Sequence, residues 1–115
     1  MKIIKTIILL ILLLYLPVFG QDISSINKPL KEELEKIFDE DQKYRLMIDS
    51  FMSKYGNSSP EMKELIEKMN EVDEKNLKRV IEIINEYGWP GISLAGEKGN
   101  TAVWLVIQHG DRHPD

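Results

Sequence analysis

The chain has 115 residues, a formal net charge of −4, 30% charged residues and no cysteine. A chain of about 100 residues buries one modest core, so a single small domain is the limit. The lack of cysteine excludes disulfides, thiolate metal sites and a lipid-modified cysteine. The acidic balance argues against nucleic acid as a partner, because it repels phosphates.

Residues 1–20 are predicted to be a secretory signal peptide. Lys2 and Lys5 precede an aliphatic stretch that ends near Pro17, and the whole apolar segment is shorter than the ~20 residues that a transmembrane helix needs. We therefore expect an exported protein, periplasmic or extracellular, with no stable membrane span after cleavage. Without residues 1–20 the chain carries 13 basic and 19 acidic residues, a formal charge of −6.

A first long helix is expected from Pro29 to Tyr55, after a flexible polar leader at residues 21–28. Apolar residues recur there at steps of three and four, the spacing of one buried helical face, and Asp41 and Arg45 interrupt this stripe. The stripe consists of Leu30, Leu34, Ile37, Phe38, Ile48, Phe51, Met52 and Tyr55. The domain is assigned to residues 29–115.

A second long helix is predicted between the breaker at residues 56–60 and Gly88. Ser59 is placed to cap its start and Pro60 to occupy its first turn. The short connection favours an antiparallel pair of helices. Asp73 and Asn76 fall on or beside the apolar side of this helix.

A Gly/Pro-rich loop is expected at residues 88–100, with a short extended piece at 92–94. The following run, Ala102 to Ile107, is uniformly apolar and fits either a buried strand or a buried helix, although its β-branched residues favour a strand on local propensity. If nothing else in the chain covers this run, a partner chain would have to do so.

Three separated blocks form a recognisable pattern. They are Asp41-Gln42 with Arg45; Asp73 with Asn76, followed by Glu86-Tyr87-Gly88-Trp89-Pro90 and Gly96; and Ala102 through Trp104-Leu105 to Gln108-His109. This pattern resembles the bacterial family called domain of unknown function 6624, over roughly residues 30–113. The resemblance implies a mainly helical domain in which the run from Trp104 to His109 is helical, and it implies no reaction. The family pattern continues beyond Asp115, so a C-terminally truncated domain is expected.

The candidate site residues are polar positions on apolar helical faces. An inward-facing charge must meet a partner, since an unpaired buried charge is costly. The catalytic candidates are His109, Asp41 and Asp73, and the ligand-binding candidates are Arg45, Asn76, Gln108 and Trp89. Apart from Trp89, which could line a ligand pocket but is more typical of a core residue, we expect them to converge in a buried polar cluster. In that cluster the imidazole would be the group whose charge changes near neutral pH.

Two weaker signals lie at the C-terminus. His109, Asp111 and His113 form a weak metal-ligand pattern, because histidines four residues apart share a helical face. The segment from His109 to Pro114 is also similar to the Arg-His-Gly-x-Arg-x-Pro signature of histidine acid phosphatases. Gln108 stands where the first arginine of that signature belongs, which removes a cation that would stabilise the phosphoryl transition state. A degenerate phosphatase-like fragment is therefore a remote alternative.

The sequence thus predicts a mainly α domain, with two long antiparallel helices and a third apolar helix after a Gly/Pro loop. The favoured function is a binding or interaction module that needs no cofactor, because neither a Gly-x-Ser-x-Gly elbow nor a phosphate-binding glycine loop occurs. The alternative is a small hydrolase-like or metal-dependent enzyme. In that enzyme His109 acts as general base beside Asp41 or Asp73, and Arg45 holds an anion.

Overall fold

The computed structural model describes residues 25–110, and within them the chain is helical without a strand. The expected signal peptide and the metal-ligand candidates Asp111 and His113 lie outside the described residues. The elements are α2 (Lys28–Lys43), η1 (Arg45–Met47), α3 (Ile48–Tyr55), α4 (Pro60–Tyr87) and α5 (Ile92–Gly110). The prediction of a mainly α domain is confirmed. No described helix combines the length and the apolar character needed to cross a membrane.

The stretch expected as one long first helix is two helices joined by a 3-10 turn. α2 begins beside Pro29, where the Asn27 side chain accepts a hydrogen bond from the Leu30 amide at 3.1 Å. It ends at Lys43, and the Met47 amide then donates to the Tyr44 carbonyl at 3.1 Å to close the 3-10 turn. The helix therefore breaks at the interruption that the apolar stripe showed.

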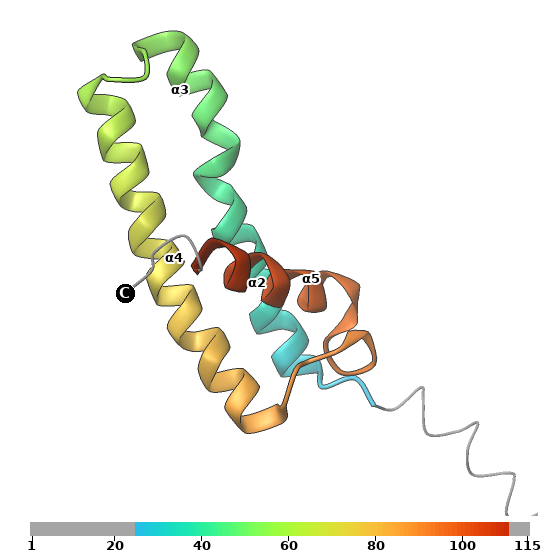
Figure 1. Ribbon diagram of the computed structural model, residues 1–115. Helices are drawn as coiled ribbons and strands as arrows, with labels where there is room; N and C mark the ends of the chain where they lie inside the picture. Colours follow the sequence, from blue (N-terminus) through green and yellow to red (C-terminus); the bar gives the residue numbers. More distant parts are fainter. Residues whose placement is uncertain (1–24, 111–115) are drawn as a thin grey trace, which may run out of the picture.

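α4 has the ends that its sequence predicts. The Ser59 hydroxyl accepts a hydrogen bond from the Met62 amide at 3.1 Å, and Pro60 occupies the first turn. At the other end Gly88, with φ of 74°, donates its amide to the Ile84 carbonyl at 2.8 Å. The first half of α4 lies beside α3 and the second half beside α2 (Figure 1).

α5 begins earlier than expected, so the predicted extended piece at 92–94 is wrong. The amides of Leu94 and Ala95 donate to the Gly91 carbonyl at 3.1 and 2.9 Å, which starts a helical turn. Gly96, at φ 72° and ψ 173°, then kinks the helix in a conformation that is open essentially to glycine alone. The run from Ala102 to Ile107 is helical, which settles the choice between strand and helix.

One half of the molecule, which we call the body, holds the hydrophobic core. The body comprises α2, α5 and residues 73–87 of α4. Its core residues are Leu30, Leu34, Ile37, Val80, Ile83, Ala95, Ala102, Val103 and Val106. Because three of these come from the apolar run of α5, this chain itself covers that run, and the partner chain expected for that purpose is not required.

The other half, which we call the arm, comprises α3 and residues 60–72 of α4 (Figure 1). No residue of α3 is buried. On the α4 side of the arm, Met62 and Leu65 are buried, but they are not part of the core in the body. The arm is therefore a pair of helices with little interior of its own.

Candidate functional site

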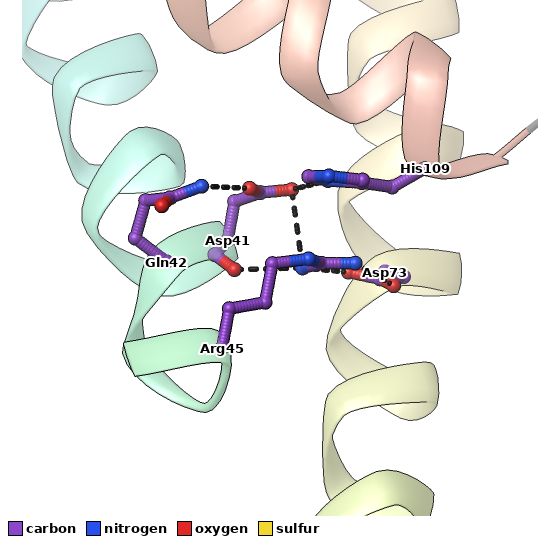
Figure 2. Close-up of polar contacts among 5 residues, drawn as sticks. All are labelled: Asp41, Gln42, Arg45, Asp73 and His109. Carbon is purple, nitrogen blue, oxygen red and sulfur yellow. Dashed lines mark hydrogen bonds and ion pairs between the residues drawn. The ribbon is translucent and has the colours of Figure 1, made fainter. Parts of the chain in front are cut away.

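Polar side chains from three helices and the 3-10 turn meet at one place in the body (Figure 2). Asp41 comes from the end of α2, Arg45 from η1, Asp73 from α4 and His109 from the end of α5. Together with Gln42 we call them the charged cluster. The sequence predicted the convergence of the four ionisable residues, and the structure brings them together.

Arg45 joins α2 to α4. Its Nη1 and Nη2 atoms donate to the two carboxylate oxygens of Asp73 at 2.9 and 2.6 Å, a bidentate pair. Nη1 also donates to the main-chain carbonyl of Asp41 at 2.7 Å, which the ending helix leaves without an amide partner. Burial lowers the pKa of Arg45, but its hydrogen bonds to Asp73 and the two carboxylate charges outweigh burial and raise that pKa above its ordinary value.

Asp41 joins α2 to α5. It is 1% exposed, and its Oδ1 lies 2.8 Å from Nδ1 of His109. Gln42 donates from Nε2 to the other oxygen, Oδ2, at 2.8 Å, and Nη1 of Arg45 lies 3.6 Å from Oδ1. Every carboxylate oxygen of Asp41 and Asp73 thus has a partner within the chain, so neither buried charge is left uncompensated.

The cluster is close to electrically neutral. Its two carboxylates face one guanidinium and one imidazole, so it carries no net charge when His109 is protonated and one negative charge when His109 is neutral. In the neutral ring, a proton on Nδ1 would be donated to Asp41 and would leave Nε2 as the acceptor. This is the arrangement that orients a histidine as a general base in carboxylate–histidine pairs.

The same residues could offer ligands to a metal ion. One ligand atom each from Asp41, Asp73 and His109 lies within 4.8 Å of the others. Arg45, however, contacts both oxygens of Asp73, and its positive charge would repel a cation at that place. A metal would have to displace the guanidinium, so the geometry favours an ion network over a metal centre.

Three ligand-binding candidates lie outside the cluster. Asn76 is buried, its amide nitrogen has no hydrogen-bond partner among the described residues, and it lines a surface cavity of about 130 Å³. Gln108 is exposed. Trp89 is 45% exposed and packs edge-to-face against Trp104, with ring centroids 5.7 Å apart. The structure thus does not bring Asn76 or Gln108 into the charged cluster, and a ligand-binding role for the three residues stays a prediction.

Gln42 belongs to the cluster but was not predicted as a site residue. The only feature of the sequence that could have identified Gln42 is its position directly after Asp41 in the Asp-Gln block. A neighbour in a helix points about 100° away, given 3.6 residues per turn, so helical periodicity alone does not select it. The long side chain of Gln42 bends back to reach Oδ2 of Asp41.

A second ion pair joins α2 to α4 at a more exposed position. Arg79 donates from Nη2 to Glu33 Oε2 at 3.0 Å, and its Nε also contacts Oε1 of Glu33. The hydrogen bonds from Arg79 hold the pKa of Glu33 below its ordinary value, and those from Arg79 to Glu33 raise the pKa of Arg79. This pair lines the cavity at Asn76 and is separate from the charged cluster.

The model of one protein family matches residues 28–114 and is described as a family of unknown function (DUF6624). The matched range contains α2 to α5 and every member of the charged cluster. This match confirms the resemblance that the sequence blocks indicated. No curated protein and no solved structure matches the chain.

Proposed function

Because the chain belongs to the family of unknown function DUF6624, whose description names no activity, we propose a function from its geometry. The protein is an exported helical interaction module. The charged cluster holds the three helices of the body together, and the arm supplies the surface that contacts a partner helix.

The observation that carries the proposal is an apolar groove on the arm. It has a volume of about 940 Å³ and lies between α3 and the start of α4. Ile48, Met52, Met62 and Ile66 contribute its apolar side chains. We call it the arm groove. Exposed apolar hollows of this size are typical of binding sites, and a groove between two helices suits the apolar face of a third helix.

The charged cluster supports a structural role rather than a ligand site. All four carboxylate oxygens of Asp41 and Asp73 are already paired with Arg45, Gln42 or His109. A ligand would have to break these contacts before it could form its own. The cluster connects the ends of α2 and α5 to the middle of α4, which is the place where the arm leaves the body.

The apolar fluorophore anilinonaphthalene sulfonate tests the arm groove. We expect the native protein to bind it, and we expect Met52→Gln and Ile66→Gln each to weaken binding by about tenfold, because each loses roughly 1.4 kcal/mol of apolar contact. Ile81→Gln is the matched control, since Ile81 is 45% exposed on α4 outside the arm. Circular dichroism verifies that each variant is folded. Equal binding by all variants would contradict the proposal.

Export is proposed from the predicted signal peptide at residues 1–20. Expression of the full chain in a bacterial host, followed by fractionation and mass spectrometry, tests it. We expect a periplasmic or secreted product that lacks these residues. A full-length product that stays in the cytoplasm would contradict this part of the proposal without affecting the arm groove.

The second candidate function is an enzyme in which His109 is the general base. The observation that favours it is the 2.8 Å contact between His109 Nδ1 and Asp41 Oδ1, with Arg45 beside the pair. His109→Ala separates the two functions. Loss of stability with unchanged fluorophore binding supports the interaction module. Tight binding of Zn²⁺, or hydrolysis of nitrophenyl esters, that disappears in His109→Ala would favour the enzyme.

A further inference from the structure

We infer that the occupant of the arm groove is a second copy of this chain, so that two arms form a four-helix bundle around a two-fold axis. This inference rests on the proposed function, because it names the partner of the arm groove. Three properties of the arm carry it, namely its small interior, its apolar surface on two faces and the charges at the rim of the groove.

The arm lacks the cover that its helices need. α3 has only 8 residues, none of them buried, and isolated helices shorter than about 12–15 residues are marginal in water. In the body, by contrast, α5 covers both α2 and α4. The arm has no third helix from the described part of this chain. An identical hairpin of helices would supply two.

Apolar side chains line hollows on two faces of the arm. Besides the arm groove, a smaller hollow of about 260 Å³ is lined by Met47, Phe51, Tyr55 and Leu65 among others. Phe51 and Tyr55, which line it, pack edge-to-face with ring centroids 5.3 Å apart. The arm groove is the larger and more apolar of the two, so we place the second copy there.

The rim of the arm groove carries one charge of each sign. Lys63 and Glu67 line it, one helical turn apart on α4, and within residues 25–110 neither forms an ion pair. Glu64 and Lys68 on the same helix do pair, at 3.1 Å. A two-fold contact presents the same patch from both sides, so each Lys63 can face Glu67 of the other copy.

A partner whose contacting face carried charge of a single sign would fit this rim less well. It would be attracted by one of the two side chains and repelled by the other. A second copy meets both charges with their opposites. This complementarity favours a second copy over partners whose contacting face carries charge of a single sign.

Sedimentation velocity of the exported protein over a wide concentration range tests the inference. We expect a monomer–dimer equilibrium that Lys63→Glu and Glu67→Lys each weaken by about tenfold, because each places like charges in contact. The double variant with both substitutions restores the opposite pairing and should recover most of the dimer affinity. Lys78→Glu is the matched control, since it makes the same charge change at an exposed position of α4 outside the groove.

The outcomes separate this inference from the proposed function. A protein that stays monomeric while the fluorophore still binds the arm groove overturns the second copy and leaves the interaction surface intact. If the fluorophore does not bind the arm groove at concentrations where the protein is monomeric, the proposed function itself is overturned. A dimer that Lys63→Glu and Lys78→Glu weaken equally, or that the double variant does not restore, also overturns the inference. Fluorophore binding that falls as the dimer forms supports it.

Discussion

The body and the arm are built from helices of the same amphipathic kind, but within the described residues only the body has a further helix that covers their apolar faces. In the body, α5 packs across α2 and α4 and buries the core, together with two carboxylates that have internal partners. In the arm, no residue of α3 is buried and Met52 is 46% exposed. An apolar stripe therefore predicts which face of a helix is apolar, but not whether a neighbouring helix of the same chain covers that face.

The largest expected effect is at Arg45, where the arm leaves the body. Arg45→Met leaves two buried carboxylates without their cation and should lower the free energy of unfolding by about 3–5 kcal/mol. Urea denaturation measures it. Adding Asp73→Leu removes one of the stranded charges and should recover part of the loss. A cost near zero for Arg45→Met would mean that the cluster is solvated and that the body does not depend on it.

Truncation of one apolar side chain in each half tests the comparison directly. Leu34→Ala, in the fully buried core of the body, should cost about 2–5 kcal/mol through lost contacts and a cavity. Met52→Ala in the arm should change the stability of the monomer by less than about 0.5 kcal/mol. Both are measured by urea denaturation at concentrations where the protein is monomeric. Similar costs for the two would remove the distinction between the halves.

Gly96 gives an intermediate effect confined to the body. Gly96→Ala forces a side chain into a backbone conformation with φ of 72° and should cost about 1–3 kcal/mol. Thermal unfolding measures it. Gly91→Ala is the control, because a Cβ there meets nothing within 4 Å and the backbone is not in the left-handed region. If both substitutions destabilise the protein equally, the backbone conformation at Gly96 does not fix the position of the part of α5 that follows it.

The smallest expected effect is the pH dependence that Glu33 contributes to the body. Its pKa is lowered in the folded state, so its contribution is present above the ordinary value of 4.5 and is lost as the pH falls through the folded value. The pair is partly exposed, so the contribution should be at most about 1 kcal/mol. Glu33→Gln should remove it. The free energy of unfolding of Glu33→Gln and of the parent protein should therefore differ less at low pH than at neutral pH. If that difference is the same at neutral pH and below the folded pKa of Glu33, this assignment is contradicted.

Most of the body could be predicted from the sequence for two reasons. Helix ends are marked by residues close in the chain, and charged residues on a buried face must find partners. Ser59 and Gly88 marked the ends of α4 through hydrogen bonds to nearby residues. The meeting of Asp41, Arg45 and Asp73 followed from the requirement that inward-facing charges find partners. The family resemblance implied a helix over Trp104 to His109, although local propensity had favoured a strand over Ala102 to Ile107. Burial between α2 and α4 outweighed that propensity.

The rest depended on contacts that local signals do not encode. Gln108 was expected beside His109, but consecutive residues of a helix point about 100° apart, so only one of them can face the cluster. Trp89 lies in the turn between α4 and α5, where its ring packs against Trp104. The break after Lys43 was visible as an interrupted stripe, but the contact of Arg45 with Asp73 that follows it joins residues 28 positions apart in the sequence.

The edge-to-face pair of Trp89 and Trp104 contains both tryptophans of the chain and lies at the turn between α4 and α5, in the body. Intrinsic fluorescence is therefore a reporter on one half of the molecule, whereas far-ultraviolet circular dichroism sums over all its helices. A single cooperative transition would give superimposable melting curves from the two signals. Fraying of the arm before the body would appear as a loss of ellipticity that precedes any change in tryptophan emission, without a label or a further substitution.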